Sequence, residues 1–159
     1  MHMIKPIMDF VSLFNASVSL DENQIVRKEN RYFLINKNLK RLLSKDFFYA
    51  GNYLGKIKNG KFFPSFRLLS MIAERKANKI IVDKKTEWLF ICGRDIFKQG
   101  IIKVMGSKRK GDYTLILNLH DECLGFGRIL HNLDEEIGGV VVRNVSDVGD
   151  FLRREKQQS

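Results

Sequence analysis

The sequence predicts an α+β protein with two domains: an N-terminal α/β layer domain with a mixed or antiparallel sheet over residues 1–83, and a β-rich domain, a barrel or a sandwich, over residues 84–159. Helical and strand patterns alternate in the first part, whereas short strands separated by polar turns dominate the second. The polar segment Asp83–Glu87 separates these two patterns and is therefore the best linker in the chain.

Three segments of the first part have helical spacing. Apolar residues recur at intervals of three and four in "IMDFVSLF" (residues 7–14), "NLKRLLSK" (38–45) and "RLLSMIAERKA" (67–77). Each segment is therefore expected to bury one face of a helix against the sheet of this domain.

Strands are expected between these helices. "RYFLI" (Arg31–Ile35) reads as a strand, and Asn59 and Gly60 lie between two apolar runs. An Asn-Gly pair in that position favours a type I′ hairpin, because both turn residues need a positive φ. "KIIV" (Lys79–Val82) is expected to be the last strand of the first domain.

The second part is expected to contain a short helix and a closing helix among its strands. Gly93 and Gly100 bracket about one and a half helical turns, too few residues for a crossover between parallel strands. In "SDVGDFLRREK" (146–156) acids precede cations, as the helix dipole favours. The expected strands are Trp88–Cys92, Ile101–Met105, Tyr113–Leu119, Cys123–Leu130 and Ile137–Val142.

The charge of the chain indicates a polyanionic partner. The 159 residues carry a net charge of +10, with 15 basic and 7 acidic side chains in residues 1–83 and 13 and 11 in residues 84–159. The isoelectric point is near 9.7, and nucleic acid is the usual partner of so basic a protein. The apolar runs are too short for a membrane span and the N-terminus does not resemble a signal peptide, so neither is expected.

No set of residues predicts catalysis. The chain has no Ser/His/Asp set, no paired carboxylates in a glycine-flanked cleft and no Walker-type loop, so no catalytic residue, cofactor or metal ion is expected. Cys92 and Cys123 lie in apolar runs and are expected to be reduced, buried thiols, with a disulfide as the alternative.

Three further patterns bear on ligand binding. "LGFG" (Leu124–Gly127) lacks the third glycine and the helix of a dinucleotide-binding fingerprint, and its glycines instead allow close approach of another backbone or a ligand. "GSKRKGD" (Gly106–Asp112) is either a solvated turn or a phosphate contact. Aromatic and basic residues interleave over residues 49–67, where most rings are expected in the core and Tyr49 and Tyr53 are candidates for stacking on single-stranded RNA.

The motifs of the second part resemble those of the PUA domain, a partly open β-barrel named for pseudouridine synthases and archaeosine transglycosylases. "GRDIFKQGI", "LGFG" and "DVGDFLRR" carry this resemblance. In that fold a short helix closes one end of the barrel, and Gly93 and Gly100 are expected to form the turns beside it. Residues 30–156 also resemble the Nip seven family of ribosome-assembly factors, through "GKFFPSF", "KIIVDKKTEWLFICGRDIFKQG", "LGFGRI" and "SDVGDFLRRE" in that order.

This resemblance implies an α/β domain followed by a PUA-type pseudo-β-barrel. It also implies a role in large ribosomal subunit assembly and pre-rRNA processing, with single-stranded or looped RNA bound by the barrel and other assembly factors bound by the N-terminal domain. The RNA-binding residues expected from it are Arg94, Lys98, Lys103, Arg143, Arg153, Arg154 and Lys156.

Two other functions stay open at the level of sequence. One is a PUA-containing RNA-modification enzyme or its accessory subunit, against which the missing catalytic set argues. The other is an adaptor whose N-terminal domain holds another protein of an assembly complex. A cytoplasmic location is expected, or a nucleolar one if the source is eukaryotic.

Overall fold

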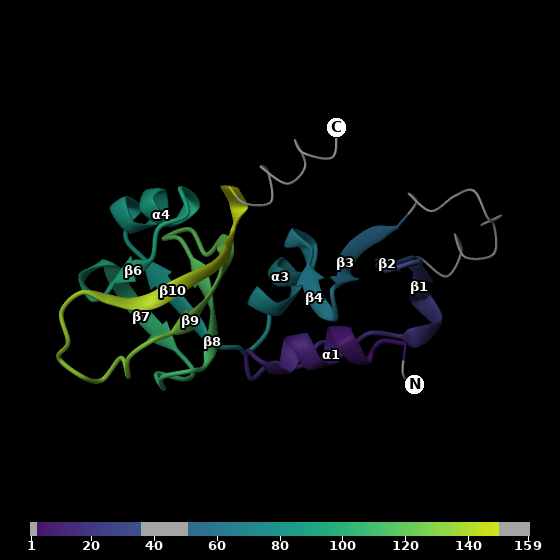
Figure 1. The fold of residues 1–159 in the computed structure, drawn as a ribbon, viewed down its shortest axis with the longest axis horizontal. Helices are drawn as coiled ribbons and strands as arrows, with labels where there is room; N and C mark the ends of the chain where they lie inside the picture. Colours follow the sequence, from purple (N-terminus) through teal and green to yellow (C-terminus); the bar gives the residue numbers. More distant parts are fainter. Residues whose placement is uncertain (1–2, 36–50, 150–159) are drawn as a thin grey trace.

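The computed structural model describes residues 3–35 and 51–149. Within these residues the strands form two sheets, an N-terminal sheet with the order β1-β2-β3-β4 and a barrel sheet with the order β6-β10-β9-β8-β5-β7. Figure 1 shows the sheets toward opposite ends of the molecule, with α3 between them and α1 along the lower side of the view. The fold is therefore α+β, with an antiparallel N-terminal sheet followed by a curled β-barrel, as predicted.

The N-terminal part follows its local sequence patterns. Helix α1 buries Ile7, Phe10 and Val11, and α3 starts at Ser65, whose hydroxyl accepts a hydrogen bond from the Leu68 amide at 3.0 Å. In chain order the elements are α1 (Lys5–Ser12), η1 (Glu22–Gln24), β1 (Ile25–Lys28), β2 (Arg31–Leu34), β3 (Asn52–Lys58), β4 (Lys61–Pro64) and α3 (Phe66–Ala73).

The predicted hairpin is confirmed. Asn59 and Gly60 connect β3 to β4 with φ values of 53° and 73°, the positive angles that a type I′ turn requires. Strand β1 was not predicted, because its short run "IVRK" carries two charges among four residues. The predicted helix at residues 38–45 and the candidate stacking residue Tyr49 lie outside the described residues.

The barrel sheet includes one strand that the sequence assigned to the first domain. Strand β5 pairs antiparallel with β7 and parallel with β8, so its assignment as the last strand of the N-terminal sheet was wrong. The elements are β5 (Lys79–Val82), α4 (Lys84–Ile91), β6 (Ile96–Phe97), η2 (Lys98–Gly100), β7 (Ile101–Met105), β8 (Tyr113–Leu117), β9 (Cys123–Ile129) and β10 (Val140–Asp147). The division of the chain after residue 83 stays a prediction, and a cut there would separate β5 from both neighbours.

The strand predicted at Trp88–Cys92 is also wrong, because this segment belongs to α4. The Asp83 carboxylate accepts a hydrogen bond from the Thr86 amide at 2.8 Å, so the expected linker is instead the N-terminal cap of a helix. The short helix predicted between Gly93 and Gly100 is wrong as well: the helix of this region, α4, ends at Ile91, and β6 and the 3-10 turn η2 lie between the two glycines.

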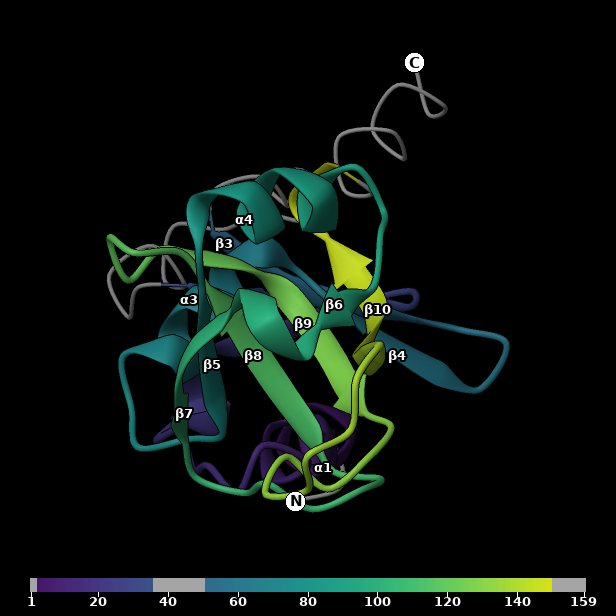
Figure 2. The same cartoon turned by 90° about the vertical axis from the view of Figure 1, so that its left-hand side faces the viewer.

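The barrel sheet curls until its two ends meet. Its end strands β6 and β7 are joined directly through η2, and α4 lies across one end of the barrel (Figure 2). Phe90 of α4 is fully buried in a cluster with Ile80, Ile96 and Ile116, inside the barrel. None of the helices in the described part of the chain has the length and apolar character needed to cross a membrane.

A second apolar core lies on the other side of the barrel sheet and joins the two parts of the protein. Phe10 and Phe14 of α1 contact Phe126 of β9 edge to face, with ring centroids 5.4 and 5.6 Å apart. Leu115 of β8 and Leu68 of α3 are fully buried in the same cluster. The N-terminal part and the barrel therefore share one hydrophobic core.

The two cysteines are free and have different environments, since Cys123 is buried as expected and Cys92 is exposed, contrary to expectation. Burial raises the pKa of the Cys123 thiol to about 11.

Because the thiolate is the reactive form, we expect iodoacetamide at pH 8 to modify Cys92 and to leave Cys123 intact until denaturant is added. Peptide mass spectrometry measures both sites, and equal labelling of both cysteines in the folded protein would contradict the burial of Cys123.

Candidate nucleic-acid interface

The exposed face of α4 combines an aromatic ring with positive charge. Thr86 and Phe90 point into the barrel, whereas Trp88 is 64% exposed. Lys84 and Lys85, four and three residues before Trp88, are exposed on the same side of the helix. Hydrogen bonds from the Thr86 side chain and amide lower the pKa of Asp83, so the cap carboxylate is charged and fixes the start of this helix.

Arg94 extends this surface beyond the end of α4. Its amide donates to the Leu89 carbonyl at 2.9 Å, and its own carbonyl accepts from the Asn144 side chain at 3.3 Å. The Asn144 side chain also donates to the Phe90 carbonyl at 2.9 Å, and its backbone amide donates to the Asp95 carboxylate at 2.8 Å. Asn144 of β10 thus holds the segment after α4 in place, and the Arg94 side chain is exposed.

The other predicted contacts are spread over the barrel. Lys98 is half-buried and its ammonium group donates to the Glu135 carbonyl, so it secures the loop before β10. Lys103 is exposed on β7, at the other end of the sheet order from β6. Of the described members of the predicted set, Arg94 follows α4 by three residues, while Lys98 and Lys103 are placed elsewhere. Arg153, Arg154 and Lys156 lie outside the described residues.

Arg143 lies on the opposite face of β10 from Asn144. It lines a groove with residues of α1 and of the β3–β4 hairpin, whereas the side chain of Asn144 reaches the helix on the other face. The strand register places Arg143 directly opposite Arg128 of β9. Sequence reasoning missed Arg128, because only the pairing of two strands separated in the chain brings the two arginines together.

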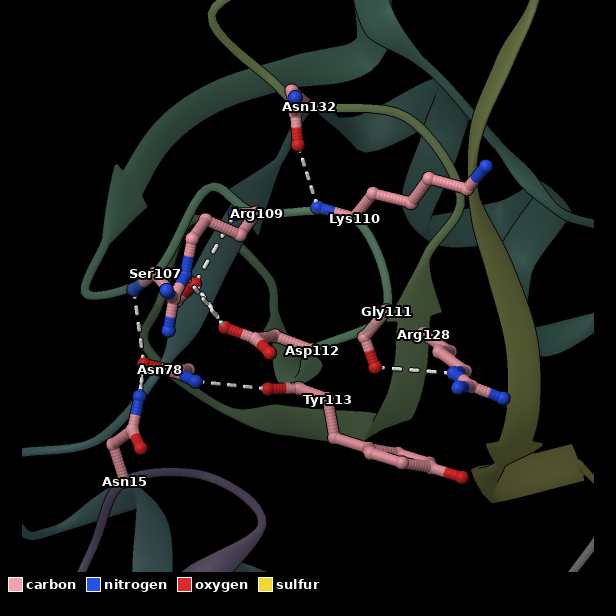
Figure 3. A network of polar contacts seen from close by, with 10 residues as sticks. All are labelled: Asn15, Asn78, Ser107, Arg109, Lys110, Gly111, Asp112, Tyr113, Arg128 and Asn132. Atoms are coloured by element: carbon pink, nitrogen blue, oxygen red, sulfur yellow. Dashed lines mark hydrogen bonds and ion pairs between the residues drawn. The ribbon is translucent and has the colours of Figure 1, made fainter.

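The basic loop at Gly106–Asp112 has a backbone that is held by the protein itself. The Ser107 amide donates to the Asn78 side chain at 2.9 Å, the Arg109 amide to the Ser107 hydroxyl at 3.1 Å, and the Lys110 amide to the Asn132 side chain at 2.8 Å (Figure 3). These amides are therefore not directed at a ligand, as they are in phosphate-binding loops. The loop can therefore contact a ligand through its side chains.

Two of the three cations of this loop have acidic neighbours. Lys108 lies 3.3 Å from the Asp134 carboxylate and Arg109 lies 3.7 Å from that of Asp112. Both pairs are largely exposed, so they neutralise charge without holding the side chains firmly. The Lys110 side chain is exposed and points toward the side of the loop where Arg128 lies (Figure 3).

Of the aromatic residues expected in the core between residues 49 and 67, Phe62 and Phe63 are half-buried, whereas Phe66 of α3 is 41% exposed, contrary to expectation. Phe62 packs against Phe10 with a centroid distance of 5.5 Å. Tyr53 is 36% exposed and contacts Phe33 at 5.6 Å. Burial raises the pKa of Tyr53, an effect that the positive charge of Arg31 opposes. Tyr53 is therefore a partly covered ring with a cation nearby.

Trp88 was not among the candidate contacts predicted from sequence, because its segment was assigned to a strand. The signal that identifies it is the cap formed by Asp83 and Thr86, which turns the following residues into a helix and brings Lys84 and Lys85 beside the indole. Among residues 3–35 and 51–149, no group of three His, Cys, Asp or Glu side chains could hold a metal ion.

Comparison with known proteins agrees with this architecture. Residues 78–156 match the family model of the UPF0113 PUA domain. The C-terminal part is a PUA-type barrel, and the matched range begins before β5. A UPF0113 protein of Archaeoglobus fulgidus is 30% identical over 112 residues, which cover 68% of this chain and 63% of that relative.

Two solved structures show the same PUA fold. A conserved PUA domain protein from Thermoplasma acidophilum superimposes with a TM-score of 0.62 at 20% identity, over 95% of this chain and 92% of that chain. A PUA domain from Aeropyrum pernix K1 does so with a TM-score of 0.51 at 23% identity, over 62% of this chain and 59% of the other. At these identities the likeness is one of fold.

Proposed function

We propose that this protein is a non-enzymatic RNA-binding factor that assists assembly of the large ribosomal subunit and processing of pre-rRNA. The match of residues 78–156 to a PUA-domain family supports RNA binding, and the resemblance to the Nip seven family supports the ribosomal role. The proposal includes a cytoplasmic location and binding of other assembly factors by the N-terminal part.

The observation that carries RNA binding is the surface of α4. An indole that is 64% exposed lies beside two exposed lysines on the same helix face, and Arg94 follows at the end of the helix. An exposed indole stacks on an unpaired base while nearby cations contact phosphates. Single-stranded and looped RNA present such bases, whereas duplexes keep them stacked, so the surface suits the former.

Binding of single-stranded RNA is expected to quench the fluorescence of Trp88, which is the single tryptophan of the sequence. We expect Trp88→Ala to weaken binding about tenfold, because stacking on one base contributes about 1–3 kcal/mol, and Trp88→Phe to retain most of the affinity. Replacing Lys84 and Lys85 with alanine should flatten the slope of log affinity against log salt by about 0.7 per lost contact. Fluorescence anisotropy of a labelled oligonucleotide at several salt concentrations measures both effects.

The charge-matched control replaces Arg67 and Arg75 with alanine. Both are exposed near the ends of α3, which packs on the other side of the barrel sheet from α4. This variant should bind RNA nearly as well as the unmodified protein. If heparin and duplex DNA bind as tightly as single-stranded RNA, the interaction reduces to net charge and the proposal fails. The same titration on a variant with Arg153, Arg154 and Lys156 replaced tests the predicted contacts beyond the described residues.

A further inference from the structure

A groove lies between the two parts of the protein, away from α4. Its volume is about 760 Å³, and its walls come from α1, from the β3–β4 hairpin and from strands β8 to β10. Phe10, Phe62, Tyr113 and Phe126 contribute aromatic rings to it. Phe10 and Phe126 are only 6% and 5% exposed, so the rings that a ligand can reach are those of the half-buried Phe62 and Tyr113, one from each part of the protein.

Each of two walls of this groove carries a pair of cations that oppose each other across neighbouring strands. On the hairpin, Lys61 lines the groove and its cross-strand partner is Lys58. On the barrel, Arg143 lines the groove and its cross-strand partner is Arg128. Like charges directly opposite each other destabilise a sheet. One cation of each pair, Lys61 on the hairpin and Arg143 on the barrel, lines the groove. Two cations from opposite walls, each next to another cation, favour a polyanion as the ligand.

The barrel wall continues as a basic surface toward the loop at Gly106–Asp112. The Arg128 side chain donates to the Gly111 carbonyl at 3.1 Å, and its guanidinium lies over the Tyr113 ring, 5.5 Å from the centroid (Figure 3). These contacts hold Arg128 beside the loop that presents Lys110. The acid of the groove, Asp9, is already paired with Lys5 at 2.7 Å. The Asp9 carboxylate is therefore not available to neutralise Lys61 and Arg143 on the two walls.

We propose that this groove binds a segment of single-stranded RNA, whose phosphates contact Lys61 and Arg143 and whose bases meet the rings of Phe62 and Tyr113. Cations beside aromatic rings are what recognition of single-stranded RNA uses, since any base can stack on a ring or on a guanidinium plane. The inference rests on the proposed function and adds a second contact surface to it, formed jointly by the N-terminal part and the barrel. This surface explains how the basic excess of residues 1–83 contributes to RNA binding.

The test replaces Lys61 and Arg143 together with alanine, one cation from each wall. We expect the salt slope for single-stranded RNA to flatten by about 1.4, which corresponds to two lost phosphate contacts, and the melting temperature to stay within about 2 °C, because surface substitutions change stability little. The matched control is again the variant that lacks Arg67 and Arg75. Oligonucleotides containing 4-thiouridine should crosslink to peptides that contain Phe62 or Tyr113.

The outcomes separate this inference from the proposed function. If the double variant binds RNA with unchanged affinity and slope while Trp88→Ala loses affinity, the groove proposal is overturned and RNA binding by α4 stands. If the unmodified protein does not bind single-stranded RNA, both proposals fail. If an oligoglutamate peptide of equal charge binds the groove in preference to RNA, the groove is a protein-binding site and the inference is also overturned.

Discussion

A fragment that begins at Thr86 is expected to be unfolded, whereas a fragment that begins at Ala77 is expected to form the barrel. The division predicted from sequence leaves β5 out of the shorter fragment, although β5 lies between β7 and β8 in the barrel sheet. Ile80 and Val82 of β5 are fully buried inside the barrel. Removing large apolar core side chains costs about 2–5 kcal/mol each, a large part of a total stability of about 5–15 kcal/mol.

The experiment compares residues 77–159 with residues 86–159 by circular dichroism and urea unfolding. The shorter fragment should show no cooperative transition. The longer one should unfold cooperatively but self-associate, because removal of α1 and α3 exposes Leu115 and Phe126, which are buried in the shared core. Cooperative unfolding of the shorter fragment would show that β5 is dispensable. Failure of both fragments would show that the barrel requires the shared core.

Gly125→Ala is expected to destabilise the protein by about 3 kcal/mol or more. Gly125 in β9 has a φ of +146°, which strains any other residue, and such strain costs about 1–3 kcal/mol. A Cβ atom there would lie 2.0 Å from the Ser146 carbonyl oxygen and 2.8 Å from the Asp147 Cα atom of β10. Both atoms belong to the backbone of β10, which pairs with β9, so the two strands would have to move apart. This movement costs about another 1–3 kcal/mol.

Thermal unfolding followed by circular dichroism measures this effect. For a protein of this size, 3 kcal/mol lowers Tm by roughly 6–12 °C. Gly138→Ala is the control, since its Cβ would meet no atom within 4 Å. A Tm of the Gly125 variant within about 2 °C of the unmodified protein would mean that β9 and β10 separate at little cost.

The geometry confirms that the glycines of "LGFG" allow close backbone approach: a Cβ at Gly127 would also lie only 2.6 Å from the Arg143 carbonyl oxygen.

Several elements could be predicted because neighbouring residues determine them. The type I′ turn at Asn59-Gly60 depends on two residues that tolerate positive φ. The buried faces of α1 and α3 follow from apolar spacing within a few turns. Strands β7, β8 and β9 coincide with apolar runs bounded by turns. The sequence motifs also indicated a PUA-type barrel, since the fold requires glycines at turns and close contacts.

Two of the wrong predictions concern the secondary structure of one segment and the sheet to which another belongs, and both depend on partners distant in the chain. "TEWLFIC" is apolar enough for a strand, and it is helical because Asp83 caps it and because Phe90 fills the interior of the barrel. "KIIV" is a strand in either sheet, and its position between β7 and β8 depends on pairing with residues 19 to 36 positions away. The apolar pattern alone could not determine either outcome, and for α4 the Asp83 cap was the local signal that favoured a helix.

By itself, the sequence of this protein determined the α+β class, the hairpin, the amphipathic helices, the basic character and the resemblance to a PUA domain. Only the tertiary structure decided that the helix carrying Trp88 lies across the barrel with Phe90 in its interior, and that Arg128 lies opposite Arg143 beside the groove. The physical reason is that propensity and hydrophobic periodicity act over a few residues, whereas register and sheet order join residues far apart in the chain. Charge can be counted from sequence, but its arrangement against aromatic rings follows from strand pairing.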